Sequence, residues 1–166
     1  MLPLKALSQE SVAAALAKAE RYRLLNEPAE AESICRDILA VEPGNQEARV
    51  ILVLAHTDQI PHDKRAFQKA VKDAAELAGP YERAYYTGIA WERRAKAAHT
   101  DNAPGSGHTV YEWISKALDH FEDAERLRPQ GNDDAVLRWN TCVRFLQHHP
   151  NLGPRSVEVP EAIVSE

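Results

Sequence analysis

The sequence predicts an all-α protein, and three observations lead to that prediction. The chain of 166 residues is 44% hydrophobic and 27% charged, which is the balance of a folded globular domain rather than of a disordered chain. Alanine and leucine are abundant, whereas β-branched runs are short. Apolar residues recur at helical spacing from Ser8 to His149. We therefore expect one domain of about seven helices, which can bury a core without disulfides or metal.

Caps and prolines divide the first half of this pattern into four helices. Ser8 is expected to cap the first helix, and Pro28 suits the first turn of the second. Asn45 is expected to cap the third. After a lead of residues 1–7, the predicted hairpins span residues 8–42 and 45–78, and the fourth helix begins near Asp63.

The second half is predicted to contain three more helices. The fifth carries Glu92 and Lys96 as an (i, i+4) pair on its exposed side. Residues 99–108 form the one long loop, after which the capping box of Thr109 and Glu112 begins the sixth helix. The predicted bounds are 80–128 for this third hairpin, 132–149 for a last helix capped by Asn132, and 150–166 for an extended, mobile tail.

Two stretches far apart in the chain carry small, apolar and proline residues at one spacing. They are Ala31, Ile38 and Pro43 in the first hairpin and Ala117, Phe121, Ala124 and Pro129 in the third, with the interval from alanine to proline unchanged. In the first helix of each of these hairpins, a small residue stands three positions before an aromatic one. The pairs are Ala19 with Tyr22, and Gly88 with Trp91. This pattern resembles the tetratricopeptide repeat.

The resemblance covers roughly residues 8–149 and weakens in the middle. Lys18 and His56 stand where the family has large apolar or aromatic residues, and the third unit holds about seventeen extra residues between Trp91 and Ala117. The resemblance implies a right-handed superhelical stack of three antiparallel hairpins, capped by a last helix.

In the tetratricopeptide family, the first helix of each hairpin faces a concave groove that binds peptides or helices of partner proteins. Carried over position by position, the resemblance implies partner contacts for Leu16, Glu20, Arg23, Val50, Leu54, Thr57, Tyr85, Ile89, Glu92, Arg93, Leu137, Thr141 and Arg144. Aromatic rings beside arginine are typical of binding hot spots. The alternative interpretation is that Tyr85 and Ile89 pack in the core and the arginines lie on a solvated face.

Arg93, Arg94 and Lys96 form a basic cluster that suits a carboxylate or phosphate of a partner, unless Glu92 neutralises it. The chain as a whole has a formal net charge of -5, which argues against binding nucleic acid.

The sequence indicates neither catalysis nor a cofactor. His120, His148 and His149 lack the spacing of a helical metal pair, and no catalytic motif occurs, so neither a metal site nor enzyme activity is expected. Cys35 and Cys142 lie among apolar neighbours and are interpreted as reduced thiols.

No run approaches the roughly 20 apolar residues of a membrane span, and residues 1–7 are too short and polar for a signal peptide, so a cytoplasmic location is expected. The first hypothesis for function is an adaptor that binds a peptide or helix of another protein. The second is a structural subunit whose groove is buried by self-association as a homo-oligomer, or by its own tail, in which Val157, Val159, Ile163 and Val164 are apolar. The third is a helical metal protein or enzyme.

Overall fold

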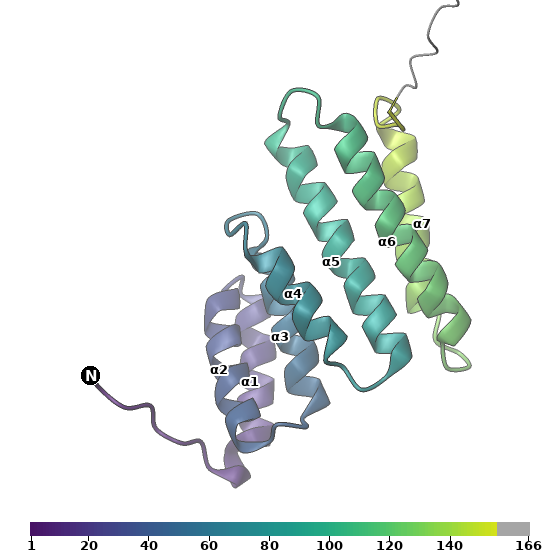
Figure 1. Ribbon diagram of the computed structural model, residues 1–166. Helices are drawn as coiled ribbons and strands as arrows, with labels where there is room; N and C mark the ends of the chain where they lie inside the picture. The colour runs from purple at the N-terminus through teal and green to yellow at the C-terminus, as the bar shows by residue number, and fades with distance from the viewer. Residues whose placement is uncertain (156–166) are drawn as a thin grey trace, which may run out of the picture.

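The computed structural model describes residues 1–155, and all regular structure in that range is helical (Figure 1). No strand occurs between residues 1 and 155. A short 3-10 turn at Gln9–Ser11 precedes seven helices, which are α1 (Val12–Leu24), α2 (Pro28–Val41), α3 (Gln46–Gln59), α4 (Ala66–Ala75), α5 (Pro80–Asp101), α6 (Gly107–Leu127) and α7 (Asp134–His148). The predicted all-α class and the number of helices are confirmed.

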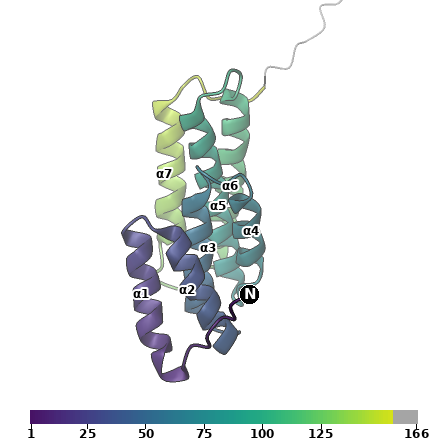
Figure 2. The ribbon, with the colours of Figure 1, turned by 90° about the vertical axis from the view of Figure 1, so that its left-hand side faces the viewer.

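Consecutive helices pack against one another in chain order, so the stack runs from α1 and α2 at one end to α6 and α7 at the other (Figure 1). The helices also form two layers. The odd-numbered layer is continuous from α1 to α5, because α1 contacts α3 and α3 contacts α5. Figure 2 shows α1 and α7 on the opposite side of the molecule from α4 and α6. The surface of the odd-numbered layer is therefore built from several segments that are distant in sequence.

Small residues allow the helices to approach closely. Ala19, Ala31 and Ala117 are fully buried, as their places in the repeated pattern predict. At Gly88 on α5, an added Cβ would lie 2.6 Å from a ring carbon of Phe121 on α6. Glycine is required there because the ring of the neighbouring helix occupies the space that any side chain would need.

The predicted helix starts are confirmed where a side chain or a proline sets them. The Oδ1 atom of Asn45 accepts a hydrogen bond from the Ala48 amide at 2.9 Å, and Pro28 occupies the first turn of α2. The predicted cap of the last helix was wrong by one residue, because Asp133 occupies the N-cap position of α7, although Asn132 accepts a hydrogen bond from the Asp134 amide at 3.0 Å.

Other predicted bounds were wrong by a few residues. The helix α6 begins at Gly107, so Thr109 lies inside its first turn instead of at its cap. The preceding loop is correspondingly shorter, because α5 continues to Asp101. Ser8 does not cap the first helix, since its hydroxyl pairs with that of Ser11 at 2.8 Å. The helix α4 begins three residues after Asp63, whose carboxylate accepts a hydrogen bond from the Arg65 amide instead.

The expected mobile tail does not begin at residue 150. Leu152 is 7% exposed and packs against the apolar cluster of α5, α6 and α7, and its amide donates to the carbonyl of His149 at 2.9 Å. An apolar side chain after Pro150 thus closes the top of the last helix pair. The rest of the predicted tail, residues 156–166 with its four valine and isoleucine residues, lies outside the described residues.

Candidate functional site

The odd-numbered layer carries two hollows, one above the other along α5. The first, here called the apolar hollow, has a volume of about 480 Å³ and is lined by Glu20, Gln46, Glu47, Val50, Ile51, Leu54, Glu82 and Tyr86. The second, called the basic hollow, has a volume of about 460 Å³ and is lined by Pro61, Glu92, Arg93, Lys96, Ala97, Thr100, Asp101 and Arg138. Together they draw on α1, α3, α5 and α7.

The apolar hollow combines hydrophobic side chains with acidic ones. Val50, Leu54 and Tyr86 offer apolar surface that is half-buried, while Glu20 and Glu82 carry negative charge. Burial raises the pKa of Tyr86 to about 12, so its phenol is neutral and can donate a hydrogen bond. This hollow suits apolar side chains and is unfavourable for an anion.

A chain of ion pairs connects α1, α3 and α5 across the layer. Arg23 on α1 contacts Glu20 at 3.4 Å and Asp58 on α3 at 2.7 Å. The other carboxylate oxygen of Asp58 holds Arg93 on α5 at 3.1 Å. Asp58 thus uses one oxygen for each arginine, and both guanidinium groups keep further N–H donors free of this carboxylate.

The basic hollow is organised around a buried carboxylate. Glu92 is 1% exposed, and its two oxygens contact Lys96 at 2.5 Å and Arg138 at 3.4 Å. The pair of Glu92 and Lys96 is therefore present as predicted, but it is not on an exposed side. Burial acts to lower the pKa of Arg138, but the Glu92 carboxylate together with Tyr85 and Cys142 outweighs it, so that pKa is raised. Because a buried carboxylate without a partner is costly, Lys96 and Arg138 are needed for the fold itself.

The predicted basic cluster is divided between the two layers. The Arg94 guanidinium lies 4.2 Å from the centroid of the Phe67 ring and 4.0 Å from that of Trp113, between α4 and α6. Burial lowers the pKa of Arg94, and its cation is stabilised by the faces of these rings. Arg94 is therefore not available to an anion beside Arg93, and Arg138 takes its place in the basic hollow.

Several residues implied by the resemblance are buried. Leu16 packs in the cluster of α1, α2 and α3, and Ile89 packs in the cluster of α5, α6 and α7. Thr57 is fully buried and donates to the Leu54 carbonyl at 2.8 Å. These three were wrong as partner-binding residues because their side chains point into the stack. Tyr85 is half-buried between Tyr81 and Phe121, as the alternative interpretation of core packing expects.

The remaining residues divide between the hollows and the end of the stack. Glu20, Val50 and Leu54 line the apolar hollow, Arg93 lines the basic hollow with Glu92, and Arg23 lies in the ion-pair chain. Leu137, Thr141 and Arg144 are exposed on α7 but line neither hollow. The residue of α7 that lines the basic hollow is Arg138, one position after Leu137. A helix register shifted by one residue would have found Arg138 from the sequence.

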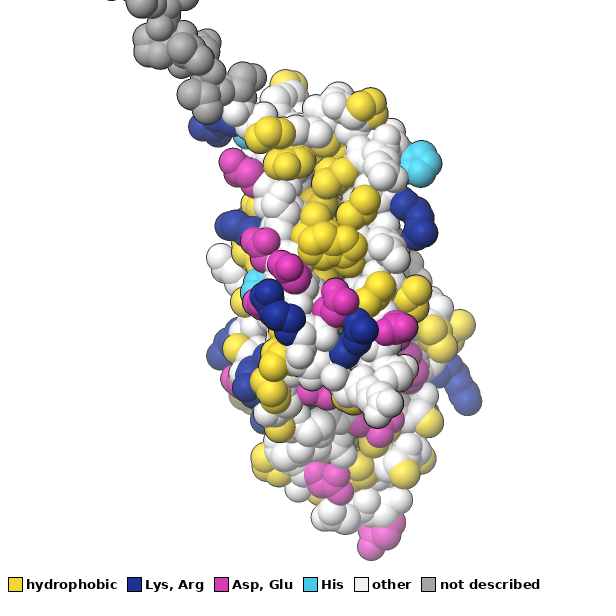
Figure 3. All heavy atoms as spheres, turned by 90° about the vertical axis from the view of Figure 1, so that its right-hand side faces the viewer, with side chains coloured by type: hydrophobic (Ala, Val, Ile, Leu, Met, Phe, Trp, Pro, Cys, Tyr) yellow, Lys and Arg dark blue, Asp and Glu magenta, His cyan; other side chains and the backbone are white. Residues whose placement is uncertain are grey.

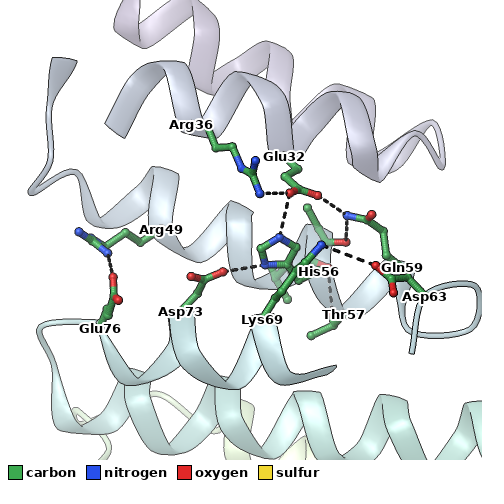
Figure 4. Close-up of polar contacts among 12 residues, drawn as sticks. Glu32, Arg36, Arg49, His56, Thr57, Gln59, Asp63, Lys69, Asp73 and Glu76 are labelled. Carbon is green, nitrogen blue, oxygen red and sulfur yellow. Dashed lines mark hydrogen bonds and ion pairs between the residues drawn. The ribbon is translucent and has the colours of Figure 1, made fainter. Parts of the chain in front are cut away.

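A separate polar cluster lies inside the stack, between α2, α3 and α4 (Figure 4). His56 is 3% exposed, and its Nδ1 and Nε2 atoms lie 2.6 Å from Asp73 and 3.3 Å from Glu32. Gln59 donates to the other Glu32 oxygen at 2.9 Å, and Arg36 contacts Glu32 at 2.5 Å. The His56 imidazole thus links three helices through carboxylates.

The described residues give no sign of a metal or of a reactive thiol. Within residues 1–155, no group of three or more His, Cys, Asp or Glu side chains is arranged to hold a metal ion. Burial raises the pKa of both Cys35 and Cys142 to about 12, which makes these thiols poor nucleophiles. None of the helices in this range combines the length and hydropathy needed to cross a membrane.

Comparison with known proteins found no match: no family model, no curated protein and no solved structure is similar to this chain.

Proposed function

We propose that this chain is a non-enzymatic adaptor of the cytoplasm, built from tetratricopeptide-like hairpins, that binds a segment of another protein on its odd-numbered layer. The segment carries a carboxylate for the basic hollow and apolar side chains for the apolar hollow. The single observation that supports this most is the basic hollow, where Arg93, Lys96 and Arg138 converge in a chain whose net charge is -5.

The packing of the hairpins supports the tetratricopeptide-like part of the proposal. The paired positions Ala31 and Ala117 are fully buried, and Gly88 contacts Phe121 where the family also has a small residue in its first helix. The extra residues of the third unit extend α5 and α6 beyond the other helices. In this proposal that extension builds the basic hollow, because Lys96, Ala97 and Thr100 lie in the added part of α5.

The charges of the basic hollow support an anionic partner group. Its lining cations Arg93, Lys96 and Arg138 are each about one-third exposed, at 37%, 35% and 33% of the side chain. Against them stand the buried Glu92, the exposed Asp101 and the half-buried Asp58, which pairs with Arg93 at 3.1 Å. A partner carboxylate can add charge-assisted hydrogen bonds to the free N–H groups without displacing an existing ion pair. Partial burial makes such bonds stronger than they are on an open surface.

A selection from a random peptide library on the immobilised protein tests this proposal without knowledge of the partner. We expect the selected peptides to place Asp or Glu a few residues from apolar side chains. The Arg93→Glu variant should bind those peptides about tenfold or more weakly in fluorescence anisotropy, since it replaces an attractive contact with a repulsive one. Arg93 is the residue to change because Lys96 and Arg138 neutralise the buried Glu92.

Arg65→Glu provides a matched control. It makes the same change of charge at a side chain that is 83% exposed in the turn before α4, outside both hollows. Its affinity for the selected peptides should equal that of the wild type. If the selected peptides carry no acidic residue, or if Arg93→Glu binds them as well as Arg65→Glu does, the basic hollow is not the binding site.

A further inference from the structure

The last two helices present an apolar face at the end of the stack. Figure 3 looks onto this end, and hydrophobic side chains gather over its upper half. Tyr111 and Leu118 on α6 and Trp139 on α7 are each half-buried and pack partly against the cluster below them. Val143 on α7 is also half-buried. We call these four residues the end face.

The end face differs from what the end of a helical stack requires. Each helix pair of such a stack covers the apolar surface of the one before it, and the terminal helices need a polar outer side for solubility. Among the described residues no helix follows α7, and an indole, a phenol and two aliphatic side chains remain partly open there. Aromatic residues of this kind are enriched in the centres of protein interfaces.

Opposite charges, Glu112 and Arg144, lie on the two sides of the end face at the same height along the helices. Glu112 follows Tyr111 on the outer side of α6, and Arg144 follows Val143 on the outer side of α7, so each charge lies one helical step beyond the apolar residues. Both side chains are exposed. The two helices are antiparallel. Glu112 lies about 7 Å from the start of α6 at Gly107, and Arg144 lies about 6 Å from the end of α7 at His148.

We propose that the end face binds a second copy of this chain in an isologous dimer whose twofold axis runs parallel to α6 and α7. A rotation about that axis keeps the height of every residue along the helices. It places the α6 side of one copy, with Glu112, against the α7 side of the other, with Arg144. Glu112 of one copy then faces Arg144 of the other, twice in the dimer, while the apolar residues meet at the centre. A twofold axis across the helices at the level of Glu112 would instead place the two Glu112 side chains opposite each other, which like charges disfavour.

This dimer goes beyond the proposed adaptor function and does not depend on it. It uses the outer side of α6 and α7, so the apolar and basic hollows of both copies remain open. An adaptor of this form is bivalent, and it binds a partner with two suitable segments more tightly than one copy does.

Charge reversal tests the proposal with variants that leave the folded monomer intact, because both charges are exposed. Sedimentation velocity over a wide concentration range should show a dimer for the wild type. Glu112→Arg and Arg144→Glu should each weaken the dimer by about tenfold or more, since each single change creates two like-charge contacts. The double variant should restore the homodimer. An equimolar mixture of the two single variants should form a heterodimer, in which both contacts are again attractive.

Leu24→Glu serves as the control for a charge placed on exposed apolar surface. Leu24 is 77% exposed at the turn between α1 and α2, at the other end of the stack, and this variant should dimerise like the wild type. A wild-type chain that stays monomeric at every concentration overturns the proposal. So does a dimer that the single reversals leave unchanged, or one that Leu24→Glu dissociates as strongly as they do.

Discussion

At Gly88 a single hydrogen atom decides how closely α5 and α6 approach. A Cβ there would lie 2.6 Å from the Phe121 ring, which is itself fully buried and has no room to move. Gly88→Val should therefore lower the free energy of unfolding by about 3 kcal/mol through overpacking. Urea denaturation followed by circular dichroism measures this difference.

Gly44 provides the comparison for that substitution. It precedes α3, and an added Cβ would meet no atom within 4 Å. Gly44→Val should change the free energy of unfolding by no more than about 0.5 kcal/mol. Equal losses for the two variants would show that the cost comes from replacing glycine and not from the contact with Phe121.

Residue identity predicted the small residues buried between helices better than it predicted the binding surface. Ala31 and Ala117 were identified as the small positions of the repeated spacing, and both are fully buried. Thr57 and Ile89 were assigned to a groove from their position within the repeat, and both are inside the stack. A position in a repeat fixes the side of a helix, but burial also depends on the length and tilt of neighbouring helices. The residues between Trp91 and Ala117 lengthen α5 and α6, which the spacing of the pattern did not describe.

At the scale of elements, three helices are held together by one polar cluster. Burial acts to raise the pKa of Glu32 on α2, but its hydrogen bond with Gln59 and the neighbouring His56 and Arg36 outweigh it, so the pKa is lowered from 4.5. A carboxylate with a depressed pKa in the folded state stabilises the fold above its unfolded pKa. That contribution is lost as the pH falls through the lower folded value.

Glu32→Gln should accordingly lower the free energy of unfolding by about 1 to 2 kcal/mol near pH 7. The difference from the wild type should stay constant down to about pH 5 and shrink below about pH 4.5, where the unfolded chain protonates Glu32 before the folded chain does. Denaturation curves across this pH range measure it. Glu30→Gln, an exposed carboxylate on the same helix, should show neither the loss nor its pH dependence. A difference that persists undiminished at low pH would mean that the charge of Glu32 is not what stabilises the cluster.

The elements were predictable where local chemistry sets them. Asn45 and Pro28 fixed helix starts that the structure confirms, because an amide acceptor and a ring-locked backbone act within one turn. The predicted start of α6 at Thr109 was wrong, because packing against the residues after α7 extends this helix by two residues toward the N-terminus. The helix extends to Gly107, whose backbone lies against Asn151 and Leu152 after the last helix. No local pattern near Thr109 contains that information.

At the scale of the whole molecule, the core consists of two main apolar clusters with a narrow connection. One cluster joins α1, α2 and α3, and the other joins α5, α6 and α7. The polar link between them is the chain of Arg23, Asp58 and Arg93. The apolar link includes Phe67 on α4, whose ring centroid lies 4.6 Å from that of Trp91 on α5. In a stack whose units contact only their neighbours, such a connection controls whether the ends unfold together.

The three tryptophans make this cooperativity measurable, because Trp91, Trp113 and Trp139 all lie on α5, α6 and α7. Tryptophan fluorescence therefore reports one end of the stack, whereas far-ultraviolet circular dichroism reports all helices. The two signals should coincide during unfolding of the wild type, as a two-state transition requires. Phe67→Ala weakens the apolar link at a cost of about 3 to 5 kcal/mol, and helical signal should then be lost before fluorescence changes. If the two curves still coincide in Phe67→Ala, the remaining contacts, which include Leu54 and the ion pairs of Asp58, are sufficient to keep both ends in one cooperative unit.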